Sequence, residues 1–323
     1  MEIRDFFLQK LTDAKGGYVS GESVAEMIGV SRNAVSKAAA QLRREGFIID
    51  SSPKKGYRIS PENLMCPGCC ISGYLKSTPP AIITENSVTS TNEEVKKLAR
   101  EGAPEGLLLT AEEQVAGKGR VGKTFFSPRG TGIYMSILLY PFFAAADAKL
   151  ITTCAAVAVC RALEPICDKP VRIKWVNDVY SGCRKVCGIL TEGSFDVESG
   201  TLSKAVLGVG INLFPPESGF GMLTGIAGTV LKDARDGWDV KGRVIAAVYD
   251  NFMEEYRRLP KAEFIEEYKK RSYLPGKNIT VLKRDSNRDA IAVKIGDDLR
   301  LLVRYENGVE EWLDSGEVSI KAK

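Results

Sequence analysis

The spacing of apolar residues separates two kinds of segment along the chain. Up to about residue 45, apolar side chains recur every three or four positions, as on a helix with one buried face. Between residues 133 and 211, they alternate with polar residues or form short runs, which is typical of strands. The mostly apolar stretch 147–168 predicts a long helix through the middle of the protein.

The amino-terminal segment predicts three helices followed by a β-hairpin. Ser20 and Ser31 stand where a side chain caps a helix, and each of these helices ends at a glycine. Two short strand-like segments, the apolar 47–49 and Tyr-Arg-Ile at 57–59, flank a turn of Ser, Pro, Lys and Gly. The two-residue link 29–30 completes a helix-turn-helix, so this unit resembles the winged helix-turn-helix family.

In that family the third helix enters the major groove and the hairpin touches the DNA backbone. The resemblance therefore implies that DNA is contacted by Arg32, Asn33, Ser36, Lys37, Lys54 and Lys55. Between residues 31 and 58 the chain has seven Lys and Arg but two acids, a local excess of five positive charges that suits phosphates. The alternative is a dimerisation or spacer module, and this charge argues against it.

The middle of the chain alternates short strands with helices. Strands are expected at 81–84, 107–110, 133–140, 171–174, 186–192 and 205–211, and helices at 93–100, 147–168, 242–259 and 261–271. Because several strands follow one another through tight turns, the sheet should be mixed and largely antiparallel, not doubly wound. Short strands after residue 272 predict a small SH3-like β-barrel.

The predicted fold class is α+β, with a winged helix-turn-helix, a mixed-sheet catalytic domain resembling class II synthetases, and a terminal barrel. The expected domains are residues 1–62, 63–271 and 272–323. The proline-rich stretch between Pro61 and Pro80 is expected to be a connector with little regular structure.

Composition narrows the chemistry. The 323 residues are 44% hydrophobic and 27% charged, as in an ordinary globular protein, and the net charge of +4 diagnoses no partner. The absence of histidine excludes Ser-His and Cys-His nucleophile pairs and histidine acid–base catalysis. The chain has no signal-peptide pattern and no apolar stretch long enough to span a membrane, so we expect a cytosolic protein whose eight cysteines are thiols.

The segment 66–70, Cys-Pro-Gly-Cys-Cys, resembles half of a metal knuckle. A structural zinc site needs four ligands, and without histidine the remaining cysteines would have to come from scattered core positions. Two interpretations stay open, a coincidental cluster and a labile redox pair.

The segment 117–124, Gly-Lys-Gly-Arg-Val-Gly-Lys-Thr, fits the G-x-x-x-x-G-K-[ST] pattern of a phosphate-binding loop. That loop requires a buried strand before it and a helix after it. The preceding residues 111–116 are not a buried strand, and the following segment contains Pro128, Gly130 and Gly132, which no helix tolerates. What survives is a glycine-rich loop with three cations, suited to closing over an anionic ligand.

Other polar motifs lie at predicted element ends. The segment 90–93, Ser-Thr-Asn-Glu, fits a capping box with Ser90 as the cap and Glu93 at the third helical position. It also places hydroxyls, an amide and free N–H groups where a polar ligand binds well. The segment 174–178 follows a strand, and the glycines in 185–190 and 208–212 allow close backbone approach.

Taken in this order, the motifs resemble the biotin–protein ligases that double as biotin operon repressors. That family carries S-T-N, a G-[RK]-G-R-x-G-[RK] loop followed by an aromatic residue and Ser-Pro, K-W-P-N-D, K-x-x-G-I-L, G-x-G-x-N and a late S-G-E-V strand. Here these motifs stand at 90–92, 117–123 with 126–128, 174–178, 185–190, 208–212 and 315–318. Val176 stands in place of the usual proline, Lys118 where arginine is more frequent, and Phe125 where tryptophan is common.

The resemblance implies condensation of biotin with ATP to biotinyl-5′-AMP, then transfer to one lysine of a biotin carboxyl carrier domain. It assigns biotin to Ser90, Thr91, Asn92, Gln114, Lys118, Gly119, Arg120, Lys185, Gly188, Gly208 and Gly210. It assigns ATP to Arg120, Lys123, Phe125, Asn177, Lys185 and Asn212. The implied catalytic residues are Arg120, Lys185 and Asp178, of which Asp178 orients Mg²⁺ or the incoming lysine.

The residues suit that chemistry. A carboxylate is already ionised at neutral pH, so its attack on a phosphate needs no general base but does need neutralising cations. The further partners implied are operator DNA and a second copy of the chain when the adenylate is bound. A lipoate–protein ligase, and a ligase whose DNA-binding module is idle, remain alternatives.

Overall fold

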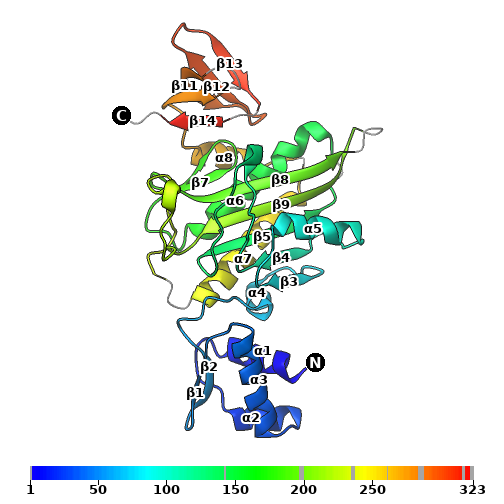
Figure 1. Ribbon diagram of the computed structural model, residues 1–323. Coiled ribbons are helices and arrows are strands. Elements are labelled where there is room, and N and C mark those ends of the chain that lie inside the picture. Colours follow the sequence, from blue (N-terminus) through cyan, green and yellow to red (C-terminus); the bar gives the residue numbers. More distant parts are fainter. Residues whose placement is uncertain are drawn as a thin grey trace.

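A computed structural model of the protein describes residues 2–141, 143–195, 200–233, 237–259, 261–282, 287–314 and 317–320. Three units are stacked along one axis, with the amino-terminal helices at one end and a small β domain at the other (Figure 1). Within these ranges the strands form sheets of two, seven and five strands, and helices accompany them, so the α+β class is confirmed. Each sheet falls within one of the three expected domains, whose limits stay a prediction.

The amino-terminal unit consists of α1 (Ile3–Asp13), α2 (Gly21–Ile28), α3 (Arg32–Arg44), β1 (Ile49–Ser52) and β2 (Gly56–Ile59). Ser20 and Ser31 cap α2 and α3 as expected, because each side chain accepts a hydrogen bond from the backbone N–H three positions further along, that of Ser23 and that of Ala34. Gly29 ends α2 with a φ of 67°, a left-handed conformation that favours glycine. Helices and hairpin bury one apolar core, which is the winged helix-turn-helix arrangement that the sequence predicts.

The connector differs from the expectation of irregular structure. It contains a helix, α4 (Gly68–Tyr74), which packs against α1 and against α7 (Gly237–Tyr256). Gly242 on α7 allows this approach, because an added Cβ there would lie 2.5 Å from the sulfur of Cys70. The helix escapes sequence analysis because two of its seven residues are glycines and none of its N-terminal residues is a side-chain cap.

The central sheet is mixed and largely antiparallel, as predicted. Its strand order is β3-β4-β5-β9-β8-β7-β6, and β3 and β4 form its one parallel pair among the described ladders. The strands are β3 (Ile82–Glu85), β4 (Leu108–Ala111), β5 (Gly132–Leu139), β6 (Val171–Lys174), β7 (Asp178–Ser181), β8 (Arg184–Phe195) and β9 (Leu202–Asn212). The sequence analysis missed β7, a four-residue strand directly after the 174–178 turn.

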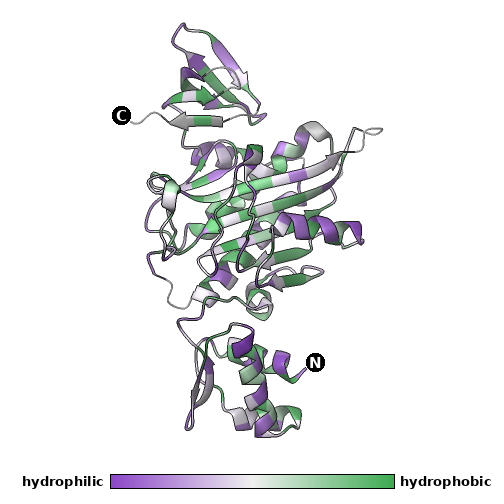
Figure 2. Cartoon of the chain, in the orientation of Figure 1, coloured by the Kyte–Doolittle hydropathy of each residue, from purple (hydrophilic) through white to green (hydrophobic). Residues whose placement is uncertain are grey.

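Helices cover both faces of this sheet. On one face lie α6 (Lys149–Leu163), α7 and α8 (Ile265–Arg271), and on the other lies α5 (Thr91–Arg100) (Figure 1). The side chains of β9 alternate accordingly, because Leu207 and Val209 join the main core whereas Val206 packs under α5. Figure 2 shows the result, with hydrophobic central strands and hydrophilic outer helix faces. The predicted helix 147–168 is α6, which ends five residues earlier than expected.

The carboxy-terminal unit is an antiparallel sheet in the order β13-β12-β11-β10-β14. Its strands are β10 (Asn278–Leu282), β11 (Asn287–Ile295), β12 (Leu301–Tyr305), β13 (Glu310–Leu313) and β14 (Glu317–Ile320). It contacts the central unit through Trp175, whose indole N–H donates to the Leu299 carbonyl oxygen at 2.8 Å. Ser315 and Gly316 of the expected S-G-E-V motif lie outside the described residues.

A buried ion pair joins the connector to the central unit. Lys241 on α7 is 2% exposed, and its Nζ donates to Glu112 Oε2 at 2.6 Å and to the Leu64 carbonyl oxygen at 2.7 Å. The other carboxylate oxygen of Glu112 accepts from the Cys66 N–H at 2.7 Å. Because each charge has a partner, this clamp holds the connector against the end of β4.

We predict that Lys241→Met lowers the free energy of unfolding by about 3–5 kcal/mol, because it leaves the Glu112 carboxylate buried and unpaired. Urea unfolding followed by tryptophan fluorescence measures the change. Lys97→Met, which removes an exposed pair with Glu94, should cost less than about 1 kcal/mol. Equal losses in the two variants would contradict the clamp.

Candidate functional site

Two adjoining hollows on the α5 side of the central sheet gather the site residues predicted from the sequence. The inner hollow is lined by Ser90, Thr91, Asn92, Gln114, Lys118, Gly119, Arg120, Phe125, Asn177, Lys185, Gly188, Ile189, Leu190, Gly208, Val209 and Gly210. The outer hollow is lined by Gly119, Arg120, Lys123, Thr124, Phe125, Phe126, Lys174, Trp175, Asn177, Asp178, Tyr180, Lys185, Asn212, Phe220, Leu223, Ile226, Ala227, Leu282 and Val318. Arg120 and Lys185 belong to both linings, so the hollows meet at two cations.

The inner hollow exists because the sheet carries small residues in place of large apolar ones near the amino-terminal end of α5. Ser136 on β5 and Gly208 on β9 are direct cross-strand partners in the sheet. The side chain of Asn92 fills the space above Gly208, where an added Cβ would lie 2.3 Å from Asn92 Oδ1. Ser136 donates to that same oxygen at 2.6 Å, and Asn92 Nδ2 donates to Glu192 Oε2 at 2.7 Å. These two contacts fix the orientation of the Asn92 amide.

The helix start differs from the predicted capping box. Ser90 stands at the cap position, but its side chain makes no capping hydrogen bond. Gln114 takes this role from a separate segment, since its Oε1 accepts from the Thr91 N–H at 2.9 Å and lies 3.2 Å from Thr91 Oγ1. The sequence motif misleads here because the carboxylate of Glu93 binds lysines instead of a backbone N–H.

The glycine-rich loop is a small hairpin and not a phosphate-binding loop followed by a helix. Lys118 and Thr124 form a β-bridge, and one 3₁₀ turn (Arg120–Gly122) lies at the tip. Val121 in that turn has a φ of 53° and is 79% exposed, an unusual conformation for a β-branched residue. The base is tight, because an added Cβ on Gly117 would lie 2.4 Å from the Phe125 carbonyl oxygen.

The loop is tied to both sides of the inner hollow. Lys118 Nζ lies 2.7 Å from Glu93 Oε1 on α5, and Arg120 Nη1 donates to Asn177 Oδ1 at 3.0 Å on the opposite side. Two lysines around the Glu93 carboxylate, first Lys118 and then Lys96, lower its pKa to about 2. This carboxylate is therefore ionised at neutral pH.

Phe125 separates the two hollows. Its ring fills the space left by the glycines of β8 and β9, since added Cβ atoms on Gly210 and Gly188 would lie 2.5 and 3.2 Å from ring atoms. Gly188 and Gly210 face each other across the β8–β9 ladder, so a cross-strand pair of glycines makes this space. Tyr134 contacts the ring edge, with centroids 6.5 Å apart.

An ion pair holds one of the two cations that line both hollows. Lys185 Nζ lies 2.7 Å from Asp178 Oδ1, and the side chains are 29% and 21% exposed. Asn177 is held beside this pair, because its Nδ2 donates to the Ile189 carbonyl oxygen at 2.8 Å. Val176 keeps the turn in place at the usual proline position, with its carbonyl oxygen accepting from the Tyr268 hydroxyl at 3.1 Å.

The sequence analysis missed several residues around the hollows. The buried Ser136 and the partly exposed Glu192 belong to no motif, because their contacts to Asn92 depend on strand register. The apolar rim of the outer hollow, formed by Phe126, Phe220, Leu223 and Ile226, lies on loops without periodicity. The one signal in the sequence was a group of apolar residues in the glycine-rich stretch 217–228, and the structure leaves several of them exposed.

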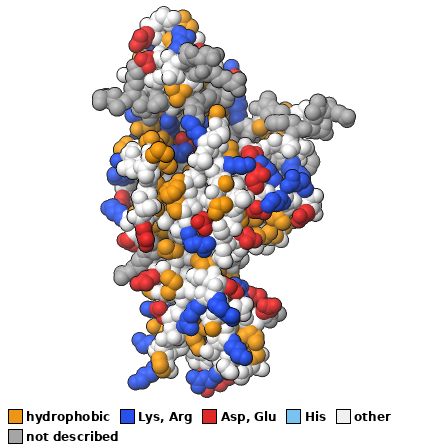
Figure 3. All heavy atoms as spheres, viewed as in Figure 1, with side chains coloured by type: hydrophobic (Ala, Val, Ile, Leu, Met, Phe, Trp, Pro, Cys, Tyr) orange, Lys and Arg blue, Asp and Glu red, His pale blue; other side chains and the backbone are white. Residues whose placement is uncertain are grey.

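The residues predicted to contact DNA lie together on the amino-terminal unit. Arg32, Asn33, Ser36 and Lys37 are exposed on α3, and Lys54 and Lys55 are exposed in the hairpin turn. Lys55 lies over the ring of Tyr18 at 5.7 Å, and Arg32 lies 3.9 Å from Glu22. Figure 3 shows Lys and Arg side chains exposed on this end of the molecule.

The three cysteines of the connector are free thiols with little solvent access. Cys66 and Cys70 are buried, and burial raises the pKa of the Cys66 and Cys69 thiols. Thiols of this kind react slowly, which favours coincidence over a labile redox pair. Within the described ranges, no three Cys, Asp or Glu side chains are placed to hold a metal ion. Those ranges also contain no helix that is both long and apolar enough to cross a membrane.

Comparison with known proteins agrees with this geometry. Residues 85–212 match the biotin/lipoate A/B protein ligase family, and residues 4–58 match an HTH domain. A protein of Bacillus subtilis (strain 168) named bifunctional ligase/repressor BirA is 31% identical over 263 residues, which are 79% of this chain and 78% of the relative. The chain belongs to the biotin protein ligase family.

Further relatives of the ligase family support the assignment. A protein of Bacillus spizizenii, also named bifunctional ligase/repressor BirA, is 32% identical over 213 residues, and the match spans 65% of each chain, just under two thirds. Among solved structures, the biotin protein ligase of Aquifex aeolicus in complex with biotin and ATP has a TM-score of 0.60 and 27% identity. That match covers 76% of this chain and 100% of the other.

We predict that Gly208→Ala lowers the free energy of unfolding by about 1–3 kcal/mol, because the new Cβ displaces Asn92 from Ser136 and Glu192. Chemical denaturation followed by circular dichroism measures this. Gly73→Ala, at an exposed position of α4, has no atom within 4 Å of the new Cβ and should leave stability unchanged or increase it slightly. A neutral Gly208→Ala would show that Asn92 has room to move.

Proposed function

We propose that the protein condenses biotin with ATP to biotinyl-5′-AMP and transfers the biotinyl group to a lysine of a biotin carboxyl carrier domain. One observation carries the proposal. A small polar hollow and a larger, partly apolar hollow meet at Arg120 and Lys185, where a ligand carboxylate and an α-phosphate would have to react. The relatives that match most of the chain are named ligase/repressors, in agreement with this assignment.

In this proposal the inner hollow holds biotin. Thr91, Asn92 and Gln114 offer hydrogen-bonding groups of fixed orientation to its ureido ring, with Ser90 beside them. The glycines Gly188, Gly208 and Gly210 leave room for the apolar part of the ligand, and Gly119 lets the loop backbone approach it. Lys118 and Arg120 close the open side from the glycine-rich loop.

The outer hollow then holds ATP. Phe125 offers a ring for stacking with adenine, and Asn177 and Asn212 offer polar groups to the nucleotide. Lys123, Arg120 and Lys185 supply positive charge along the phosphates. The apolar rim excludes water, which strengthens every charge interaction inside.

Charge neutralisation, and not proton transfer, is the work of this site. A carboxylate oxygen attacks the α-phosphorus and forms the mixed anhydride while the bond to the pyrophosphate oxygen breaks. Both reactants are anions, so Arg120 and Lys185 stabilise the charge that accumulates between them. Asp178 holds the Lys185 ammonium by its ion pair and positions it toward both hollows.

The proposal includes Mg²⁺ bound with ATP. Asp178 is the carboxylate in the outer lining, and one carboxylate together with substrate phosphates is a usual ligand set for Mg²⁺. When bound, the ion would offset phosphate charge. The Asp178 contact with Lys185 means that the carboxylate serves both cations or turns from one to the other.

We predict that the purified protein, given ATP, biotin and a carrier domain, adds one biotinyl mass to the carrier, as read by intact-mass spectrometry. Lys185→Ala should slow pyrophosphate release on the order of 10²–10³-fold. Lys232→Ala, which removes a 90% exposed lysine, should not change it. Labelling with lipoate in place of biotin would overturn the substrate assignment, and equal rates for both variants would overturn the role of Lys185.

We further propose that the amino-terminal unit makes the protein a biotin-responsive repressor located in the cytosol. Exposed Arg32 and Lys37 on the third helix, and Lys54 in the hairpin turn, suit the major groove and the adjoining phosphates. Two copies paired through their central units would present two such helices to a palindromic operator. Adenylate binding and DNA binding would then strengthen each other by linkage.

We predict that biotin and ATP together tighten binding to the promoter of the organism's own biotin genes in a mobility-shift assay. Lys37→Ala should weaken binding to all sequences and reduce the salt dependence by about one ion. Lys10→Ala on α1 removes a lysine paired with Asp13 and should not do so. DNA binding that is absent, or that ignores biotin and ATP, would leave a ligase with an idle DNA-binding fold.

A further inference from the structure

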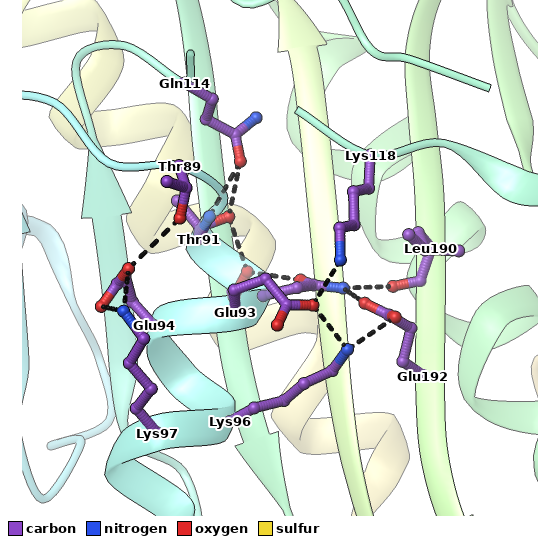
Figure 4. Close-up of polar contacts among 12 residues, drawn as sticks. Thr89, Thr91, Glu93, Glu94, Lys96, Lys97, Gln114, Lys118, Leu190 and Glu192 are labelled. Carbon is purple, nitrogen blue, oxygen red and sulfur yellow. Dashed lines mark hydrogen bonds and ion pairs between the residues drawn. The ribbon is translucent and has the colours of Figure 1, made fainter. Parts of the chain in front are cut away.

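Four alternating charges run from the central sheet to the glycine-rich loop. Glu192 on β8 binds Lys96 on α5 at 2.7 Å, and Lys96 binds Glu93 at 2.9 Å. Glu93 in turn binds Lys118 of the loop at 2.7 Å, through the same carboxylate oxygen that accepts from Lys96. Figure 4 shows the Glu93 carboxylate between the two ammonium groups.

The row of charges begins at Glu192, which also contacts Asn92, a residue that lines the inner hollow. Glu192 accepts from Lys96 with one oxygen and from Asn92 with the other, at 2.7 Å each. The orientation of Asn92 and the position of Lys118 therefore depend on one connected set of contacts. The Asn92 side chain and the glycine-rich loop are therefore connected through α5.

We propose that Glu93 is a positioning residue that latches the glycine-rich loop over the inner hollow through Lys118. With the Arg120–Asn177 contact on the other side, it makes the loop a strap fixed at two points. The latch rests on the proposed function in one respect, since what it retains is the ligand of that hollow. Its effect on the loop itself does not depend on the identity of the ligand.

The physical balance favours a latch that opens and not a permanent closure. The four side chains are between 28% and 48% exposed, so water and salt screen their attraction. Pairs of this kind shift an open–closed equilibrium a few-fold, which suits a loop that must admit a ligand and release a product. The fully buried Lys241–Glu112 pair serves the opposite purpose, since it fixes the connector.

The chain contains a matched control on the same helix turn. Glu94 also forms an ion pair three positions along α5, with Lys97 at 2.8 Å, but its other described contact is Thr89 and not the loop (Figure 4). Both glutamates lie in the first turn of α5, so both interact similarly with the helix dipole. Replacing either by glutamine therefore has similar effects on the helix, whereas only Glu93→Gln releases Lys118.

Limited trypsin digestion of the full chain without ligand tests the latch, because Arg120 and Lys123 are cleavage sites within the loop. Glu93→Gln should speed cleavage after these residues about two- to five-fold over the wild type, and Glu94→Gln should not. Cleavage elsewhere, mapped by mass spectrometry, and the urea midpoint should stay unchanged in both variants. Equal loop cleavage in Glu93→Gln and Glu94→Gln would overturn the proposal.

A double-mutant cycle keeps the test decisive if Glu93→Gln also perturbs the helix. Lys118→Gln should speed cleavage after Arg120 and Lys123 by the same factor, and adding Glu93→Gln should give no further increase. Additive effects would mean that the two residues act separately and would also overturn the latch. If the ligase assay fails while this cycle shows coupling, the proposed function is wrong and the latch remains.

Discussion

The site depends on a missing row of side chains along two central strands. Gly188 and Gly210 face each other across the β8–β9 ladder, and Gly208 lies two positions further along β9 on the same face. Nearby in the same layer, Val206 packs under α5 and closes the core. Where the apolar row stops and the glycines begin, Asn92 and Phe125 settle onto bare backbone. One face of the sheet thus contributes both to the packed core under α5 and to the cavity, and on β9 the change from Val206 to Gly208 takes two residues.

Motifs in the sequence predicted many of the residues that line the two hollows. Arg120, Lys185 and Asn212 are far apart along the chain, yet their segments line the two hollows. Such residues are recognisable because ligand chemistry restricts the residue types at each position. The winged helix-turn-helix was predictable for a different reason, since serine caps and glycine stops act locally.

The features that could not be predicted from the sequence depend on tertiary contacts. The capping box at 90–93 satisfies a local rule, but Gln114 binds the Thr91 N–H instead and leaves Glu93 free for Lys96 and Lys118. Helix α4 has weak intrinsic propensity and forms because α1 and α7 bury its apolar side. The roles of Ser136 and Glu192 follow from strand register, which a single sequence does not specify.

The contacts of Glu112 connect the amino-terminal unit to the glycine-rich loop. Its side chain holds the connector at Cys66 and, through Lys241, at Leu64. Its backbone carbonyl oxygen accepts from the Gly130 N–H, just after the loop returns to the sheet. Gln114, two residues further on, contacts both the start of α5 and Ser127. The contacts of the loop and those of the connector therefore meet within two residues of each other, at Glu112 and Gln114, so a short chain of hydrogen bonds links the segments to which the two proposed activities are assigned.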